Sequence, residues 1–222
     1  MKLAVFDFDG TLFPKDTLPF LFSHWKNLKC TRFTYYKTFL SLIPLSLKYK
    51  LQIITKLSKQ EIKLMAVRKS NRLFIGMTEQ EVIAYFSNCV QEIKGLLNEP
   101  VVREIERAHS EGFHTVLLSG AYNHLLRDIG EYLNFDTVIG SEMCFNNNYY
   151  DADKETEVVV GDLKLKKIYE RFDKDLIDWE ASRSYADSYS DIDILQAVGH
   201  PVAVNPDAKL RAIAVEKGWR II

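Results

Sequence analysis

An apolar run that ends in two acids, close to the amino terminus, constrains this chain more than any other feature. Residues Leu3 to Phe6 show no polar alternation, which predicts a strand buried on both faces, as in a parallel sheet. Asp7 and Asp9 follow at its carboxyl end, where open α/β sheets place their ligands. Burying two carboxylates together is unfavourable unless a cation or a shared proton compensates. Followed by Gly10, the pair therefore predicts a functional site rather than two solvated acids before a turn.

The rest of the chain falls into a helical block and an alternating α/β block. Helical periodicity dominates from about residue 16 to residue 111, and Thr78 with Glu81 three residues later predicts a capping box. Strands are then predicted at 113–118, 137–139, 201–204 and 219–222, with a small hairpin at 142–151. The predicted fold class is α/β, a Rossmann-like parallel sheet core with a helical cap inserted after the first strand. We predict residues 1–15 and 96–222 as the core and 16–95 as the cap.

An apolar and aromatic stripe between residues 33 and 54 is the strongest candidate for contact with a membrane surface. Lys37, Lys48 and Lys50 accompany it, and Pro44 is predicted to break the helix. Packing of these helices on one another is the preferred interpretation, and no uninterrupted apolar run is long enough to span a bilayer. We therefore expect a cytoplasmic protein, with membrane contact disfavoured.

Composition excludes several other functions. Lysine and arginine total 29 and aspartate and glutamate total 30, giving a formal net charge of −1, without the basic excess expected of a nucleic-acid-binding protein. Cys30, Cys89 and Cys144 are far apart and form no Cys-x-x-Cys pair, which disfavours a disulfide or a zinc site.

Polar residues follow other predicted strands and begin one of the later helices. Ser119 and Gly120 end the second buried strand, Lys164 lies early in a helix, and Asp187 and Asp191 follow another strand. Clustered acids with no nearby histidine or cysteine form an oxygen-donor site of the kind that selects Mg²⁺. A hydroxyl, a lysine and such a cation together suit a phosphate group. The predicted partner is thus a small phosphorylated metabolite.

In chain order these residues resemble the four motifs of the haloacid dehalogenase-like hydrolase superfamily, and most closely its phosphoserine phosphatase-like branch. The motifs are Asp7-Phe8-Asp9-Gly10-Thr11-Leu12, Leu117-Leu118-Ser119-Gly120, Gly161-Asp162-Leu163-Lys164 and Asp187-Ser188-Tyr189-Ser190-Asp191. The resemblance covers essentially the whole chain, including the cap between the first two motifs. Two features depart from a clean match: Ser190 replaces a common asparagine, and Lys166 and Lys167 are rivals of Lys164.

The resemblance implies a role for each motif residue. Asp7 would be the nucleophile that becomes an aspartyl phosphate, and Asp9 would protonate the leaving alcohol and then activate water. Magnesium would be held by the side chains of Asp7 and Asp187 and by the Asp9 carbonyl, with Asp191 orienting these ligands. The residues implied for phosphate binding are Gly10, Thr11, Ser119, Gly120 and Lys164.

Two further residues are candidates for substrate selection. Asp16 stands nine residues after Asp7, where phosphoserine phosphatases carry a glutamate for the substrate amine; a plain helix N-cap is the alternative. Arg68 belongs to a basic cluster with Lys69 and Arg72 that could hold a substrate carboxylate; a solvated face is the alternative.

The resemblance implies a Mg²⁺-dependent phosphatase that hydrolyses a small phosphate monoester through an aspartyl phosphate. The ester could be phosphoserine-like, histidinol phosphate, a sugar phosphate or a lipid-like monoester. A phosphotransferase or mutase on the same fold and a lipid-phosphate phosphatase are the alternatives. A non-catalytic binding module is least favoured, because a scaffold has no need to keep costly charges together. The sequence leaves the oligomeric state open.

Overall fold

The structure is a computed structural model of the 222-residue chain, and it describes residues 1–24, 28, 31–51 and 59–222. The last residues of the predicted apolar stripe, 52–54, lie outside the described residues. Within the described part, no helix has both the length and the apolar character needed to cross a membrane.

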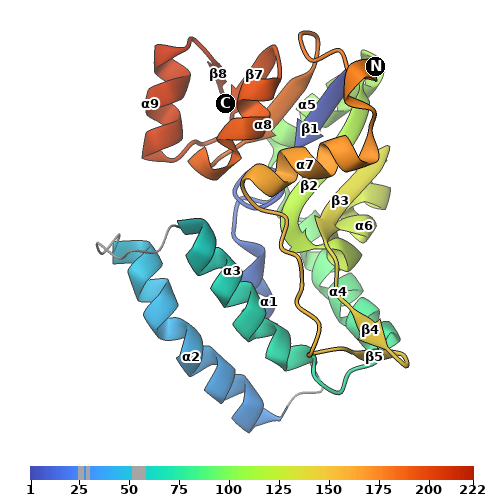
Figure 1. Ribbon diagram of the computed structural model, residues 1–222, viewed down its shortest axis with the longest axis vertical. Helices are drawn as coiled ribbons and strands as arrows, with labels where there is room; N and C mark the ends of the chain where they lie inside the picture. The colour runs from blue at the N-terminus through green and yellow to red at the C-terminus, as the bar shows by residue number, and fades with distance from the viewer. Residues whose placement is uncertain (25–27, 29–30, 52–58) are drawn as a thin grey trace.

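A six-stranded sheet, parallel throughout, forms the core, which confirms the predicted α/β class (Figure 1). Its spatial order is β3-β2-β1-β6-β7-β8. The strands are β1 Leu3–Phe6, β2 His114–Tyr122, β3 Thr137–Ser141, β6 Arg183–Ala186, β7 His200–Ala203 and β8 Arg220–Ile221. The apolar run at the amino terminus is thus a central strand, in which Val5 pairs with Val116 on one side and Ser184 on the other.

Helices cover both faces of the sheet, and the side chains of β1 alternate between them as strand geometry requires. Ala4 and Phe6 pack toward α5 (Glu99–Ser110) and α6 (Asn123–Tyr132). Leu3 and Val5 pack toward α7 (Asp162–Arg171) and α8 (Ile192–Ala197). A smaller cluster joins α8 to α9 (Ala208–Glu216). Because both faces are covered, a strand without polar alternation is stable here.

The helical cap lies between β1 and β2, below the sheet in Figure 1. It contains α1 Thr17–Ser23, α2 Arg32–Leu51, α3 Lys59–Ser70, a 3₁₀ turn at Asn71–Phe74, and α4 Glu79–Lys94. The predicted capping box begins α4: the Thr78 hydroxyl accepts from the Glu81 N–H, and the Glu81 carboxylate accepts from the Thr78 N–H. The exact division between cap and core stays a prediction.

One expectation for the cap is wrong. Pro44 does not break the helix but lies inside α2. Proline removes one backbone donor, which leaves the carbonyl four residues earlier, at Leu40, without its helical partner. Pro44 and Leu40 are both on the exposed side of α2, where water can hydrogen-bond to that carbonyl, so the helix continues.

Two further expectations were slightly misplaced. The strand predicted at 113–118 extends to Tyr122, and the small hairpin is shorter than expected, with β4 at Phe145–Asn146 and β5 at Tyr149–Tyr150. Asn147 and Asn148 connect these strands with positive φ angles, which asparagine tolerates better than most residues.

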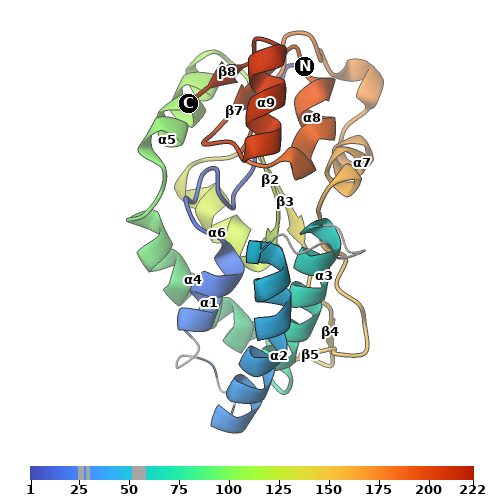
Figure 2. The ribbon, with the colours of Figure 1, turned by 90° about the vertical axis from the view of Figure 1, so that its left-hand side faces the viewer.

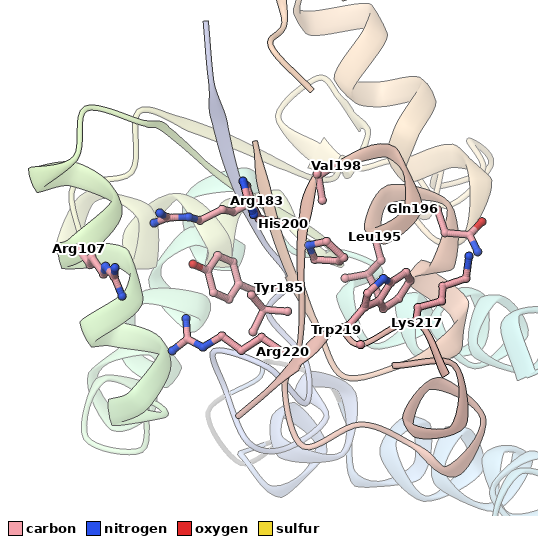
Figure 3. A pocket seen from close by; sticks show the side chains of 14 residues that line it. Arg107, Arg183, Tyr185, Leu195, Gln196, Val198, His200, Lys217, Trp219 and Arg220 are labelled. Atoms are coloured by element: carbon pink, nitrogen blue, oxygen red, sulfur yellow. The ribbon is translucent and has the colours of Figure 1, made fainter. Parts of the chain in front are cut away.

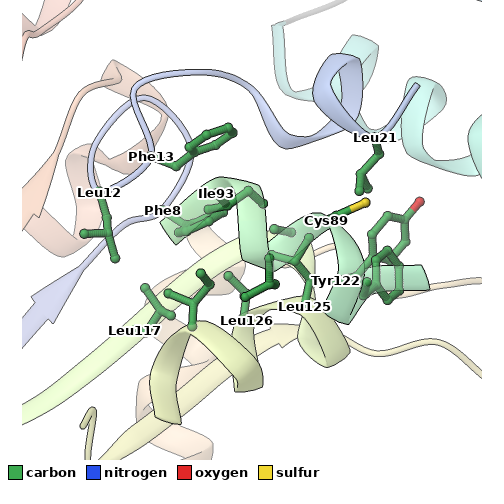
Figure 4. Close-up of a cluster of buried hydrophobic side chains, with 14 of the residues drawn as sticks. Phe8, Leu12, Phe13, Leu21, Cys89, Ile93, Leu117, Tyr122, Leu125 and Leu126 are labelled. Atoms are coloured by element: carbon green, nitrogen blue, oxygen red, sulfur yellow. The ribbon is translucent and has the colours of Figure 1, made fainter. Parts of the chain in front are cut away.

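A continuous apolar cluster joins the cap to the core beneath the loop that follows β1 (Figure 4). Phe8 and Phe13 stack with ring centroids 5.6 Å apart, and both are fully buried. The other labelled members come from the same loop and from α1, α4, β2 and α6: Leu12, Leu21, Cys89, Ile93, Leu117, Tyr122, Leu125 and Leu126. This packing fixes the position of the loop and therefore of its polar residues.

Candidate active site

The loop after β1 holds its two acids on the side opposite its aromatic anchors. The Asp7 N–H donates to the Tyr185 carbonyl on β6 at 3.0 Å, which continues the sheet by one residue. The Phe13 N–H donates to the Phe8 carbonyl at 2.8 Å and closes the turn. Phe8 is buried in the apolar core, whereas Asp7 and Asp9, on either side of it in the sequence, line the cavity of the site.

Three carboxylates converge at the carboxyl edge of the sheet. Asp7, Asp187 and Asp191 each place an oxygen within 4.8 Å of the others. Burial, reinforced by the neighbouring acids, raises the pKa of Asp187. Burial also raises the pKa of Asp191, against the opposing effect of Lys164. A raised pKa shows that the ionised forms lack sufficient compensating positive charge.

Lys164 supplies one positive charge from the first turn of α7. Its Nζ donates to Asp7 Oδ1 at 2.7 Å and to Asp191 Oδ2 at 2.8 Å, and the residue is buried. Burial acts to lower the pKa of this ammonium, but Asp191 and Asp7 outweigh it and leave the pKa raised. Its rivals face elsewhere: Lys166 pairs with Asp162 at 3.3 Å, and Lys167 pairs with glutamates outside the cluster.

The cluster suits a divalent cation of the oxygen-preferring kind. One lysine among three carboxylates leaves two negative charges uncompensated when all are ionised, and each acid offers a hard oxygen donor. No histidine or cysteine belongs to this group within the described residues, as expected for Mg²⁺ rather than Zn²⁺. The residues present therefore fit the predicted Mg²⁺.

Asp9 has a different environment at the start of α1. Its Oδ1 accepts from the Thr17 N–H at 2.9 Å and from the Thr17 hydroxyl, which fixes the orientation of the carboxyl group. Its Oδ2 lies 3.7 Å from Nζ of Lys63 on α3. Burial raises the pKa of Asp9 despite Lys63 and Thr17. A positioned carboxyl group with a raised pKa is suited to proton transfer.

Gly10 allows the loop to pass directly beside Asp187. Its φ is +78°, a conformation that favours glycine, and a Cβ at this position would overlap the Asp187 carboxylate. Its N–H donates to the Phe13 carbonyl at 2.8 Å. The neighbouring Thr11 is fully buried, and its hydroxyl has no hydrogen-bond partner among the described residues. Neither Gly10 nor Thr11 is among the described residues that line the adjoining cavity.

The acids line a cavity of about 100 Å³ between the core and the cap. Ser119 and Gly120 enter it from the end of β2, where the Ser119 hydroxyl accepts from the Ala121 N–H at 3.3 Å. The complete lining is Asp7, Asp9, Asp16, Lys63, Ser119, Gly120, Val160, Lys164, Asp187, Ser188, Ser190, Asp191 and Asp207. The cavity thus brings together residues from all four motifs.

The cap contributes one expected and one unexpected residue to this cavity. Asp16 occupies the N-cap position of α1, as the alternative interpretation expects, but its side chain makes no capping hydrogen bond and lines the cavity. Arg68 does not line the cavity and instead pairs with Glu155 at 2.5 Å on the exposed surface. Lys63, on the same helix, lines the cavity in its place. No sequence signal singles out Lys63, because helical periodicity does not say how α3 is rotated against the core.

A larger hollow, of about 920 Å³, opens at the amino ends of β6, β7 and β8, on the opposite edge of the sheet (Figure 3). Its arginines already have carboxylate partners. Arg107 and Arg183 each contact Glu111 at 2.6 Å, and Arg220 binds both oxygens of Glu104. The pairs made by Arg183 and Arg220 join α5 to β6 and β8, so the hollow has the character of a structural ion-pair network. The reactive groups are concentrated in the smaller cavity.

Comparison with known families identifies the chain. The family model of the haloacid dehalogenase-like hydrolases matches residues 4–196 of the sequence. The chain belongs to this family. The resemblance drawn from the four motifs is therefore confirmed, and the parallel sheet with its cap is the fold of a haloacid dehalogenase-like hydrolase.

Relatives of this hydrolase include phosphatases. The chain is 26% identical over 174 residues to "Phosphoserine phosphatase SerB1" of Mycobacterium tuberculosis, covering 78% of this chain and 56% of that protein. It is 29% identical over 145 residues to "Inhibition of morphological differentiation protein" of Streptomyces azureus, covering 60% and 52%. The chain thus spans about half the length of these curated relatives.

Solved structures share the fold at lower identity. A Bordetella pertussis protein of unknown function superposes with a TM-score of 0.81 at 20% identity, covering 100% of this chain and 97% of that one. A substrate-bound phosphoserine phosphatase superposes with a TM-score of 0.65 at 17% identity, covering 100% and 92%. At these identities the likeness concerns the fold alone.

Proposed function

We propose that this haloacid dehalogenase-like hydrolase is a Mg²⁺-dependent phosphatase that hydrolyses a small phosphate monoester through an aspartyl phosphate. The contact between Lys164 and Asp7, beside Asp187 and Asp191, carries the proposal. It orients the Asp7 carboxylate at the carboxyl end of β1, while burial raises the pKa of the nearby Asp9. A nucleophile and a separate proton donor are the two groups that the reaction needs.

The first half of the reaction transfers the phosphoryl group to the protein. A carboxylate oxygen of Asp7 attacks phosphorus, and the bond from phosphorus to the leaving oxygen breaks with its electron pair. Asp9 gives its proton to that oxygen, so the product leaves as a neutral alcohol. Lys164, the Ser119 hydroxyl and the backbone at Gly120 hold the transferring oxygens, because positioning and electrostatics dominate phosphoryl transfer.

The second half returns the protein to its starting state. Asp9, now ionised, takes a proton from water, whose oxygen attacks phosphorus and displaces the Asp7 carboxylate. Inorganic phosphate leaves and Asp9 is again protonated. The side chains of Asp7 and Asp187 and the Asp9 carbonyl would hold Mg²⁺, with Asp191 orienting the set. When bound, Mg²⁺ would neutralise the charge of the phosphoryl oxygens.

The test is hydrolysis of p-nitrophenyl phosphate by the Asp7→Asn variant. Loss of the nucleophile should abolish turnover, and EDTA should do the same to the wild type, with recovery on adding Mg²⁺. Asp162→Asn is the matched control, because this aspartate is exposed and begins the same helix as Lys164. Full activity of Asp7→Asn would refute the proposal.

We further propose that the leaving group is small and carries a polar or anionic substituent. The cavity is small, and Lys63 and Asp16 line its cap side with opposite charges. A phosphoserine-like or histidinol-phosphate-like ester suits such a pair, and relatives named "Phosphoserine phosphatase SerB1" and "Histidinol-phosphatase" support this choice. A small phosphorylated metabolite is thus the proposed partner.

Lys63→Met separates recognition of the leaving group from the chemistry. Loss of a charged hydrogen bond should raise KM for phosphoserine by about tenfold to a hundredfold, with little change for p-nitrophenyl phosphate. Arg68→Gln is the matched control on the same helix and should leave both substrates unaffected. If Lys63→Met lowers kcat equally for both substrates, Lys63 acts through Asp9 and not on the leaving group.

A further inference from the structure

Helix α2 leaves one long apolar face exposed on the outer surface of the cap. It lies at the left of the cap in Figure 1 and in front of the cap in Figure 2, with α3 lying along it. Phe33 is 75% exposed and Leu40 is 63% exposed. Tyr36, Ile43 and Leu47 are also exposed, and the spacing of these five residues places them on a single stripe of the helix.

The opposite face of α2 is apolar as well. Leu45 is buried, and Tyr35 and Leu42 pack against the main apolar cluster. Packing between helices, the interpretation preferred from the sequence for the apolar residues of this segment, therefore describes the buried face of α2. It does not account for the exposed face. An outer helix of a soluble domain normally presents polar residues to water, and a contiguous exposed apolar face marks an interaction surface.

The charge of the surrounding segment is one-sided. Between Thr17 and Gln60 the sequence has eight lysine or arginine residues and no aspartate or glutamate, so the remainder of the chain carries a net charge of −9 within a total of −1. On α2 itself, exposed Arg32 and Lys37 fall on the two sides of the apolar stripe by helical spacing. The eight cations are Lys26, Lys29, Arg32, Lys37, Lys48, Lys50, Lys56 and Lys59.

We propose that the exposed face of α2 docks the cap on the surface of an anionic lipid bilayer. An apolar and aromatic stripe flanked by cations is the pattern of helices that lie in the membrane interface, with rings among the acyl chains and basic groups at anionic headgroups. A second copy of the chain is a poorer occupant, because a self-complementary contact through α2 would bring two strongly basic segments together. The docking is peripheral and does not depend on which ester is hydrolysed.

The test is co-sedimentation of the full chain with phosphatidylcholine vesicles prepared with and without phosphatidylglycerol. We expect binding only to the anionic vesicles, and weaker binding at high salt because the charge attraction is screened. The double variant Phe33→Ser/Leu40→Ser should lower the partition coefficient by about tenfold or more. Leu176→Ser/Val215→Ser is the control, since these residues are comparably exposed but lie outside the cap.

A second variant keeps the proposal testable if the first misfolds. Arg32→Gln/Lys37→Gln removes charge and leaves the apolar stripe intact, and it should lower binding to anionic vesicles by roughly tenfold. Each variant should retain hydrolysis of p-nitrophenyl phosphate, which separates this proposal from the proposed function. Absence of vesicle binding by the wild type, or equal loss in the control, would overturn the proposal. Loss of a soluble dimer in the Phe33→Ser/Leu40→Ser variant, without any vesicle binding, would assign the face to a second copy instead.

Discussion

Replacement of Lys164 by methionine tests whether the carboxylate cluster is organised around one buried cation. Methionine has a similar length and fills the same space, but it leaves Asp7 and Asp191 without their shared donor. The variant therefore removes charge with little change in packing volume. Two properties should respond, the stability of the metal-free protein and the rate of phosphoryl transfer.

The size of the stability effect follows from the two contacts. At separations of 2.7 and 2.8 Å, and with an effective dielectric constant near 20, each ion pair has a Coulomb energy of about 6 kcal/mol. The desolvation penalty of the buried ions offsets much of this, and breaking one partner of a buried pair costs about 3–5 kcal/mol. For a chain of this length that corresponds to a loss of roughly 10 °C in melting temperature.

Thermal unfolding in EDTA and in Mg²⁺ measures the change in stability, and steady-state kinetics measures the change in the rate of phosphoryl transfer. The deficit in melting temperature should shrink in Mg²⁺, because the cation replaces the missing positive charge. The kcat should fall by about 10²–10³, the usual loss for one electrostatic donor. Lys166→Met is the control on the same helix, where the lysine side chain is largely exposed. Unchanged kcat, with the same melting temperature as wild type in EDTA, would refute the role given to Lys164.

Two further predictions concern other parts of the core. Gly10→Ala should lower kcat at least tenfold and weaken Mg²⁺ activation, because a Cβ would displace the Asp187 carboxylate; Gly76→Ala has the same backbone penalty with open space around it and should remain active. Glu104→Gln should destabilise the protein by about 1–3 kcal/mol at pH 7, since the carboxylate binds Arg220. Arg220 holds the pKa of Glu104 below its ordinary value of 4.5, so this stabilisation is present above pH 4.5 and should be lost on further acidification. Thermal melts from pH 7 to pH 3.5 should show the difference in melting temperature between variant and wild type closing. A difference that stays constant over this range would contradict the assignment.

The residues of the core site could be predicted because topology alone brings them together. Parallel strands place all their carboxyl ends at one edge of a sheet. Each polar residue that follows an apolar run is then a candidate for the same small region. Asp7, Ser119 and Asp187 were found in this way, and the structure places all three on one cavity. Lys164 needed the family resemblance as well, since Lys166 and Lys167 have similar local sequence.

The cap could be predicted as helical but not as a partner of the site. Periodicity identifies the apolar face of a helix, whereas the rotation and tilt of that helix depend on the side chains it meets elsewhere. Arg68 and Lys63 are both basic residues of α3, yet only Lys63 reaches Asp9. The break expected at Pro44 fails for a related reason, because solvent on the exposed side of α2 satisfies what the proline removes.

The role of the positive charge between Thr17 and Gln60 also depends on how the cap helices pack. Eight cations without an acid could neutralise the acidic cluster at the sheet edge, and the sequence alone does not exclude that use. In the structure the acids instead meet Lys164 from the core and Lys63 from α3, both of which lie outside that segment. Arg32 and Lys37 of α2 are exposed and stand beside an exposed apolar stripe on the outer face of the cap. Their charge is thus directed outward, and an anionic surface is the partner that would compensate it.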